Sequence, residues 1–542
     1  MYGMAFGPIG VTHGSRPMKI SRNLYASHCY AAFNQRVDAV APWVVSAVRP
    51  FCGYAPHDVT WRFRQRCTEL AVPGFIRFCV TRFARTGALP LDTEQIDCDG
   101  LRFEADRSVT LSAGLFLRTL AEFALHWLHA LVTILLCLRL KPDNTASMTL
   151  VFGIGIENLI ADGSDARFLA YCRHGPVVPL ARAERLVVHS VQPIESTEFG
   201  RVRYHRFPLF AALRWRGLGP LAWLRGLAGH VAALASFGWT VMRCPSAIII
   251  GRDAAYHAAA AALNCTAGLR EVVLTNSNYS AQALWMEALP GRHYRTHMVW
   301  YSENSVPTVY SDDPVDTPLS NFRFIRVDEI WVWTAGFQAF LEKLGCRATY
   351  HVVGPILWYL PEAPGPQGND TVRIAVFDVT PVSNDVAFRI GAINNYYSTA
   401  NMARFIEDIL HACAETERII GKRVKILLKH KRSYKPTHDT EYISLIEKIS
   451  GPGRAVELVS PDANMYSLVS GCNLVLITPY SSPAHVATSL GCPAIYYDPT
   501  MTVWPVFAKH PLLMFVAGRE ELVKSLSQFL DAEGHGVRVQ QV

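Results

Sequence analysis

The sequence predicts an α/β protein with two Rossmann-like domains, preceded by a mostly helical, basic N-terminal extension. From residue 148 onward, short apolar runs alternate with helical segments, which is typical of a parallel sheet covered by helices. A Pro- and Gly-rich segment at 361–369 divides this α/β region into two series. With 542 residues, half of them apolar, the chain is also too long for one hydrophobic core. We therefore expect domains at 1–145, 146–360 and 361–542.

The basic charge of the chain lies in its N-terminal extension. Eleven Lys and Arg against three acids give residues 1–90 a net charge of +8, whereas the whole chain carries +7. Basic and aromatic residues alternate there, as in Trp61-Arg62-Phe63-Arg64. This pattern suits an anionic membrane surface or a nucleic-acid backbone, and a solvated helix face is an equally good interpretation. No nucleic-acid-binding motif occurs, so we expect no nucleic-acid partner.

An apolar segment ends the extension. We expect an amphipathic or apolar helix at 111–140, whose most apolar part runs from Phe123 to Leu140 and contains His126, His129 and Arg139. Eighteen residues that include these polar groups are at the lower limit for a membrane span. The composition favours a helix that is buried or lies along a membrane, with a span as the alternative.

The first α/β series is expected to form one doubly wound domain. Its long helical stretches lie at Leu218–Val241 and Ala254–Leu263. Its expected strands are the short apolar runs Met148–Ile154, Leu186–Val191, Ala247–Ile250, Glu271–Thr275, Thr296–Tyr301, Glu329–Trp333 and Tyr350–Val353.

The second series starts after the Pro- and Gly-rich segment and is expected to form the other domain. Its expected strands are Val372–Phe377, Val424–Leu428, Val456–Leu458, Leu474–Ile477 and Ala494–Tyr496. Its expected helices are Thr399–Thr416, Tyr442–Lys448, Met465–Ser470, Ala484–Leu490 and Arg519–Leu530. Sheets of this kind bind ligands at the carboxyl ends of their strands. Residues that directly follow strands are therefore the candidates for a site.

Several motifs are absent, and their absence disfavours other enzyme classes. There is no phosphate-binding loop and no H-E-x-x-H, and Gly153–Asn158 lacks the third glycine of a dinucleotide fingerprint. These absences disfavour a kinase, an ATPase, a dehydrogenase and a zinc hydrolase. The thirteen cysteines show no zinc-ligand spacing, which favours free thiols in a reducing compartment. The first residues lack an apolar leader, so we expect a cytoplasmic protein.

Two loops of the second series are candidates for binding the phosphate of a nucleotide. They consist of Lys429, His430, Lys431 and Arg432, and of Pro479, Tyr480, Ser481 and Ser482. The first loop follows a strand and can neutralise a phosphate by its positive charge. The second precedes a helix, where hydroxyls and backbone N–H groups can hold an anion. A solvated basic turn and an ordinary helix N-cap are the structural alternatives.

The second loop and its helix also carry a resemblance to a known family. The run Ile477–Pro499, which ends in Tyr-Tyr-Asp-Pro, resembles the signature of bacterial surface-polysaccharide biosynthesis proteins of the PFTS-motif type. Tyr480 and Ser481 stand where that family usually has Phe and Thr. The loop is similar as well to that of bacterial sialyltransferases and Kdo transferases, although His430 is followed by Lys431 instead of proline.

The resemblance implies a GT-B-like glycosyltransferase that needs no metal ion or other cofactor. The donor that it implies is a nucleotide-activated sugar, first a CMP-ulosonic acid such as Kdo or a sialic-acid-like sugar, with UDP- and GDP-sugars as alternatives. The acceptor would be a growing surface polysaccharide, such as O-antigen or capsule, or a lipid-linked glycan. We expect a peripheral protein at the inner face of the cytoplasmic membrane, bound through its basic N-terminal region. A non-catalytic assembly protein and a nucleotide-sugar epimerase are the alternative functions.

A catalytic carboxylate is expected after one of the strands. Glu303 is the first candidate, because it lies in a segment that resembles a Y-E-N segment of polysaccharide transferases. A carboxylate there can take the proton from an acceptor hydroxyl. Glu157 and Asp378 are the reserves, since each also follows an expected strand. Asp498 is expected to contact the ribose or base of the donor.

Overall fold

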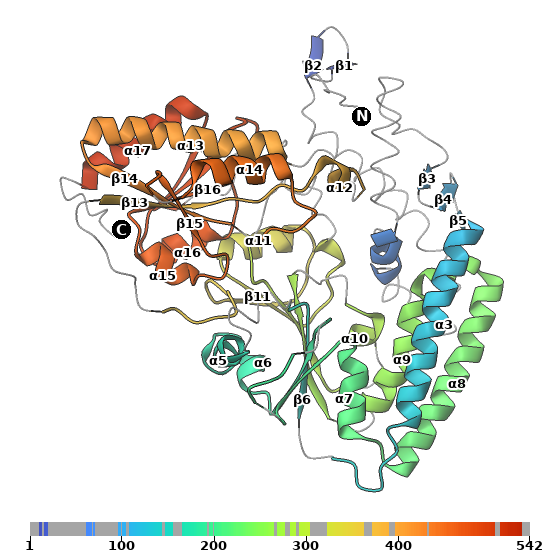
Figure 1. Ribbon diagram of the computed structural model, residues 1–542. Coiled ribbons are helices and arrows are strands. Elements are labelled where there is room, and N and C mark those ends of the chain that lie inside the picture. The colour runs from blue at the N-terminus through green and yellow to red at the C-terminus, as the bar shows by residue number, and fades with distance from the viewer. Residues whose placement is uncertain are drawn as a thin grey trace. The chain divides into compact units, whose positions relative to one another are not determined.

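The chain folds into two compact units, each built around its own parallel sheet (Figure 1). The unit that we call the N-terminal unit contains His28–Tyr301 and Ser320–Leu360, and the C-terminal unit contains Pro361–Val542 with Met1–Ser27 and Ser302–Leu319. The computed structural model describes residues 10–13, 16–19, 61–67, 69–70, 96–98, 100–104, 108–143, 147–154, 165–191, 194–198, 200–264, 268–276, 282–288, 292–303, 322–362, 371–389, 396–430, 433–451, 453–503 and 510–533.

The N-terminal unit contains a seven-stranded sheet in which all neighbouring strands are parallel. Its order is β12 (Thr349–Val352), β11 (Glu329–Val332), β10 (Arg295–Val299), β9 (Leu269–Thr275), β6 (Met148–Phe152), β7 (Arg185–His189) and β8 (Val202–His205). The chain runs from β6 to β8 in one direction and from β9 to β12 in the other. The strand order therefore reverses between β6 and β9, which is the position of the ligand crevice in doubly wound sheets.

Six of the seven strands expected in this unit are confirmed, and the one at Ala247–Ile250 is wrong. These residues lie in the 3₁₀ helix η1 (Pro245–Ile250), directly after α8 (Pro220–Arg243). All four are buried, and a short apolar run is buried equally well in a helix or a strand. The edge strand β8 is not among the expected strands, because its sequence is not a continuous apolar run.

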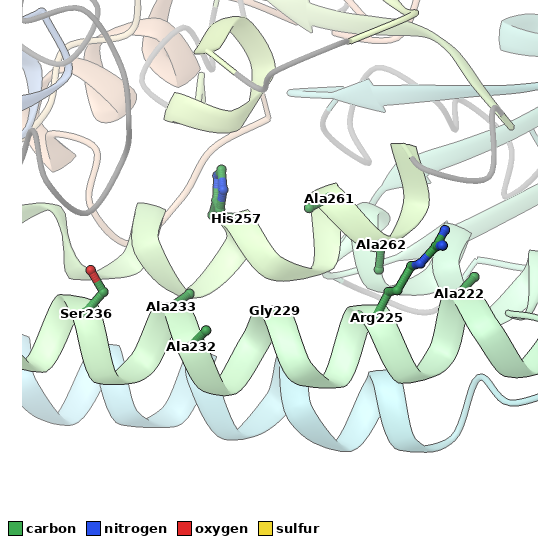
Figure 2. A pocket seen from close by; sticks show the side chains of 10 residues that line it. Ala222, Arg225, Gly229, Ala232, Ala233, Ser236, His257, Ala261 and Ala262 are labelled. Carbon is green, nitrogen blue, oxygen red and sulfur yellow. The ribbon is translucent and has the colours of Figure 1, made fainter.

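Three helices of the N-terminal unit pack lengthwise on one another. α3 (Ala113–Leu135) and α8 lie side by side, and α9 (Gly251–Asn264) contacts both of them (Figure 1). Small residues line a pocket of about 350 Å³ between α8 and α9, among them Ala233 of α8 and Ala261 of α9 (Figure 2). At Gly226 of α8, a Cβ atom would lie 3.1 Å from the Cβ of Ala262, so this glycine permits the close approach of the two helices.

The expected helix at 111–140 is confirmed in its central part. Leu111 ends a strand, Ser112 caps the helix by accepting a hydrogen bond from the backbone N–H of Leu115, and the helix ends at Leu135. Leu138 forms a parallel bridge with Leu218. The described part of the extension is helical at 61–67, as expected, and adds the short strands β1 (Gly10–His13), β2 (Arg16–Lys19), β3 (Ile96–Cys98), β4 (Leu101–Glu104) and β5 (Ser108–Leu111).

The C-terminal unit contains a six-stranded parallel sheet. Its order is β15 (Val456–Val459), β14 (Arg423–Lys429), β13 (Thr371–Phe377), β16 (Leu474–Ile477), β17 (Ala494–Asp498) and β18 (Leu513–Ala517). The order reverses between β13 and β16. All five strands expected here are confirmed, and β18 is additional.

Helices cover both faces of this second sheet. α13 (Thr399–Ile420), α14 (Thr440–Ile449) and α17 (Arg519–Glu533) lie on one face, and α15 (Met465–Ser470) and α16 (Pro483–Ser489) lie on the other (Figure 1). Alternate strand residues, such as Ile374 and Val376 of β13, point into the core under the first three helices. The remaining helices are α5 (Ala166–His174), α6 (Val178–Ala181), α7 (Pro208–Arg216), α10 (Leu284–Ala288), α11 (Ala335–Lys343) and α12 (Asn384–Arg389).

Candidate functional site

The topology of the C-terminal unit gathers the predicted residues at one edge of its sheet. Asp378 follows β13, His430 follows β14, Thr478 follows β16 and Asp498 ends β17. Because these strands are parallel, their carboxyl ends lie along the same edge, on both sides of the point where the strand order reverses. The site is therefore built on rigid strand ends.

A hydrogen-bonded chain of three buried side chains and one exposed tyrosine, Tyr434, occupies this edge. His430 Nδ1 lies 2.9 Å from Asp378 Oδ2, and the Tyr434 hydroxyl lies 2.8 Å from His430 Nε2. The Tyr442 hydroxyl donates to the same Asp378 oxygen at 2.7 Å. The other oxygen, Oδ1, is buried and has no hydrogen-bond partner within the described part of the chain.

The direction of these hydrogen bonds fixes the imidazole. An ionised carboxylate only accepts hydrogen bonds, so His430 carries a proton on Nδ1 and Nε2 is its acidic or basic position. Burial, with the Asp378 charge as the second cause, raises the pKa of Tyr434 and Tyr442 far above neutral. Both phenols are therefore donors at neutral pH. An Asp-His pair of this kind can hold, orient and transfer one proton at Nε2.

The other members of the basic loop are placed differently from His430. Lys429 is buried, and its Nζ donates to the backbone carbonyl of Pro461, on the loop that follows β15. Lys431 and Arg432 lie outside the described residues. Within the described residues, His430 is the member of the basic loop that lies within hydrogen-bond distance of Asp378.

The predicted phosphate loop forms a tight, buried turn. The Thr478 and Ser481 hydroxyls lie 2.6 Å apart, and the Tyr397 hydroxyl interacts with both side chains. The backbone N–H groups of Ala484 and His485 donate to carbonyls of the same turn, at 3.3 and 3.0 Å. These two backbone N–H groups are therefore already hydrogen-bonded within the turn. They lie at the start of α16, which is a short helix of seven residues.

Tyr480 and its neighbours give this turn its shape. Tyr480 has a φ of +58°, in the left-handed region that side chains other than glycine rarely adopt. Its buried ring packs against Tyr496, with ring centroids 5.5 Å apart. Pro479 is buried just before it, and Ser482 stands at the N-cap of α16 without a side-chain capping bond. Strained backbone of this kind concentrates at functional sites.

Glu303 belongs to the C-terminal unit and lies beside α16. It is buried, and its Oε2 lies 3.5 Å from Nε2 of His485. Burial lowers the pKa of His485 to about 4, so the imidazole is neutral at pH 7 and the contact is polar without being an ion pair. Glu157, the other carboxylate expected after a strand of the first series, lies outside the described residues.

Asp498 is fully engaged in holding its own loop. Its Oδ1 accepts from the Tyr396 hydroxyl and from the backbone and hydroxyl of Thr500. Its Oδ2 accepts from the backbone N–H groups of Thr502 and Val503 at 2.8 Å. This geometry makes Asp498 the residue that orders 499–503, and the direct contact with the donor that the sequence predicts stays a prediction.

A second candidate site lies in the N-terminal unit and is not predicted from the sequence. A pocket of about 660 Å³ opens at the ends of β6 and β7, beside the point where that strand order reverses. Its polar lining comes from residues that are far apart in the sequence: Arg62, Glu69, Glu122, His126, His129, His189, Arg206, Arg252 and Asp253. The only local signal is His189, which lies in the expected strand Leu186–Val191 and ends β7.

The acids of this pocket are paired and two of its arginines are not. Arg62 Nε lies 2.9 Å from Asp253 Oδ1, and Arg66 Nη1 lies 2.6 Å from Glu69 Oε2. No carboxylate of the described residues forms an ion pair with Arg206 or Arg252. Burial, and then these two arginines, lower the pKa of His189. The pocket therefore favours a ligand that carries an anionic group.

Among the described residues, no group of three or more His, Cys, Asp or Glu side chains is arranged to hold a metal ion.

The comparison with protein families gives one match. Residues 233–526 match the model of the family described as polysaccharide biosynthesis PFTS motif protein. The matched region includes the Asp378–His430 pair, the Thr478–Ser482 turn and Asp498. No curated protein matches the sequence significantly.

Solved structures give distant matches. A UDP-GlcNAc 2-epimerase of Methanocaldococcus jannaschii aligns over 71% of this chain and 93% of its own, with 10% identity and a TM-score of 0.36. The wall teichoic acid polymerase TagF aligns over 78% of this chain and 90% of its own, with 10% identity and a TM-score of 0.38. HepE of Anabaena aligns over 71% and 90%, with 11% identity and a TM-score of 0.36.

Proposed function

Since the chain belongs to the PFTS-motif family of polysaccharide biosynthesis proteins, we propose that it is a glycosyltransferase acting on a nucleotide-activated sugar. The sugar would be transferred to a growing surface polysaccharide or to a lipid-linked glycan. The fold class agrees with this proposal, because each unit contains a parallel sheet of the kind that binds ligands at the carboxyl ends of its strands.

The observation that carries the proposal is the Asp378–His430 pair at the reversal point of the C-terminal sheet. When a glycosidic bond to a nucleotide breaks, negative charge develops on the leaving phosphate. A protonated His430 donates from Nδ1 to Asp378 and has its Nε2–H free to donate to that phosphate once the Tyr434 hydroxyl moves aside. Asp378 stabilises this imidazolium and holds its orientation.

We assign the acceptor side to other residues. Glu303 is the base in this proposal. It is a buried carboxylate that contacts His485, just after the Thr478–Ser482 turn. The pocket with Arg206 and Arg252 would hold the acceptor glycan by an anionic group such as a phosphate or a sugar carboxylate. The proposal includes no metal ion.

The donor that we propose first is a CMP-ulosonic acid, with UDP- and GDP-sugars as the alternatives. This choice rests on the resemblance of the Thr478–Ser482 turn and its preceding basic loop to those of sialyltransferases and Kdo transferases. We also propose that the protein works at the inner face of the cytoplasmic membrane, where a lipid-linked acceptor would be available.

Ligand-dependent thermal unfolding tests the donor site. Purified full-length protein is titrated with CMP, CMP-Kdo, CMP-sialic acid, UDP and GDP, because a ligand that binds only the folded state raises Tm. We expect a rise with one nucleotide class. His430→Asn should reduce that rise, whereas His411→Asn, at an exposed position of α13, should not.

The outcomes separate the alternatives. A rise with cytidine nucleotides alone supports the ulosonic-acid donor, and a rise with UDP or GDP keeps the enzyme and changes its donor. Conversion of the donor in the absence of an acceptor would identify an epimerase. If no nucleotide changes Tm, the glycosyltransferase proposal fails and a non-catalytic assembly protein replaces it.

A further inference from the structure

Two helices of the N-terminal unit expose a continuous row of apolar side chains. On α3, Leu117, Leu128 and Leu135 are 62%, 58% and 45% exposed. On α8, Leu224, Val231 and Met242 are 57%, 57% and 71% exposed. We call these six side chains the α3–α8 face. Within each helix they are 7, 11 or 18 residues apart, and such spacings place them on one side of the helix.

The two rows lie on the same side of the helix pair. Phe123 of α3 packs on Phe237 of α8 with ring centroids 5.0 Å apart, and Trp127 stacks on His230 at 4.2 Å. The residues that face α9 are on the inner side of both helices, as His126 is beside Tyr256. The pair is antiparallel, so the exposed rows lie next to each other on the side away from α9. Figure 1 shows α3 and α8 running side by side over their whole length.

The α3–α8 face is too large to be an ordinary exposed side-chain cluster. The helices have 23 and 24 residues, which correspond to about 35 Å of length each at about 1.5 Å per residue. Two aligned helices of this length, both apolar on their exposed side, are a surface that soluble monomers rarely present to water. The aliphatic composition, with Trp239 exposed near one end, is that of an interfacial helix.

The charges around the face are positive. Arg225 lines the groove shown in Figure 2, and Arg243 lies 18 residues further along α8, on the same side of the helix. Arg118 lies at the opposite margin, on α3. α8 contains no acidic residue. The one acidic residue of α3, Glu122, lies 3.7 Å from Arg66 and lines the pocket of the N-terminal unit. An apolar face with basic margins and no acid matches an anionic lipid surface.

α3 has the length and apolarity of a membrane span, and among the described residues it is the one helix that does. Its inner side, however, carries Thr119, His126 and Thr133, which are buried against protein. A helix that packs one side on a polar protein interior and exposes the other suits the plane of a membrane better than a crossing.

We propose that the α3–α8 face inserts into the headgroup and acyl-chain boundary of an anionic bilayer, with both helices parallel to the membrane plane. The sequence suggests the basic residues 1–90 as the membrane contact and allows the helix at 111–140 to lie along a membrane. The α3–α8 face combines that helix with α8 and uses none of residues 1–90. The proposal does not depend on the glycosyltransferase function, because it concerns binding of the protein to lipid alone.

Vesicle co-sedimentation of the full-length protein tests the proposal. Vesicles of phosphatidylcholine alone are compared with vesicles that also contain phosphatidylglycerol. We expect binding that is stronger to the anionic vesicles. Leu128→Glu combined with Leu224→Glu should reduce binding at least tenfold. Ile419→Glu, at a comparably exposed apolar position on α13, should leave it unchanged.

A second variant tests the basic margins of the α3–α8 face. Replacing Arg118, Arg225 and Arg243 by Ala should abolish the preference for anionic vesicles and leave the melting temperature unchanged. Wild-type protein that stays unbound to both kinds of vesicle would overturn the proposal. So would a stable dimer in solution that dissociates on Leu128→Glu and Leu224→Glu, because the face would then be covered by a second copy.

Discussion

His430 Nδ1 lies 2.9 Å from Asp378 Oδ2, although 52 residues separate the two in the sequence. Each residue directly follows a strand, and β13 and β14 are neighbours in register, with Phe377 beside Lys429. The pair is therefore fixed by the sheet itself. The other carboxylate oxygen of Asp378, Oδ1, is buried and accepts no hydrogen bond from any described residue.

We predict that Asp378→Asn lowers kcat much more than it changes KM for the donor. The amide cannot stabilise a positive charge on His430, and its NH2 group can face Nδ1 in place of the accepting oxygen. A loss of about 10²- to 10⁴-fold in kcat is expected, the range for general acid-base groups. Steady-state kinetics with the donor identified by thermal unfolding measures it.

Tyr442→Phe is the matched control for that variant. It removes the other hydrogen bond to the same Asp378 oxygen and leaves the contact with His430 in place. A structural role for Asp378 would make both variants equally unstable and equally inactive, and would contradict the assignment. We expect instead a modest fall in stability, about 1 kcal/mol, with most of the activity retained.

Asp498→Asn should act on stability and leave nucleotide binding intact. The Oδ2 atom of the carboxylate accepts hydrogen bonds from two adjacent backbone N–H groups. In the variant, an NH2 group replaces one of the two carboxylate oxygens and therefore faces a hydrogen-bond donor. We expect a loss of about 2 kcal/mol in the free energy of unfolding. Urea titration measures this loss, with Glu441→Gln at an exposed position as the control. A loss of nucleotide affinity at unchanged stability would instead support Asp498 as a donor ligand.

The sequence is sufficient to predict the parallel sheets, because their buried strands are continuous apolar runs and Pro or Gly turns separate them. It also places His430 and Asp378 at strand ends. It does not predict which strand ends are neighbours, and this hydrogen bond depends on that order. For the same reason the pocket in the N-terminal unit is not predicted from the sequence. Its residues Arg62, His126 and Arg252 come from three distant segments of the chain.

One expected strand is wrong, and the expected contact of Asp498 with the donor stays a prediction. Ala247–Ile250 is apolar and buried, and burial alone does not distinguish a 3₁₀ helix from a strand. Asp498 has the position of a ligand-binding residue at a strand end, but Thr500, Thr502 and Val503 turn their donors back onto it. Hydrogen bonds of that kind depend on the loop's path, which the residue types do not specify.

Arg252→Ala should raise KM for the acceptor and leave donor affinity unchanged. Arg252 lines the pocket of the N-terminal unit beside Tyr256, with its guanidinium 5.7 Å from the ring centroid. Loss of one charged hydrogen bond to an anionic group corresponds to about a tenfold increase or more. Transfer assays with varied acceptor concentration measure it. Arg418→Ala, at a largely exposed position, is the control, and equal KM values for the two variants would contradict an acceptor role.

The buried histidines predict a loss of stability in mild acid. Burial lowers the pKa of His230 to about 4, from an ordinary value of 6.5, while the ring is stacked on Trp127. The unfolded chain therefore binds a proton at this residue between about pH 6.5 and about pH 4 that the folded chain does not bind. Stability is fully present above pH 6.5 and falls as the pH drops through this range.

At pH 5 this single residue should cost about 2 kcal/mol of unfolding free energy relative to pH 7.5. His230→Phe keeps an aromatic ring against Trp127 and removes the titration, so its stability should decline less between the two pH values. Urea titrations at pH 7.5 and pH 5 measure the difference, and His411→Phe serves as the exposed control. An identical decline in wild type and His230→Phe would mean that His230 is accessible to protons in the folded state.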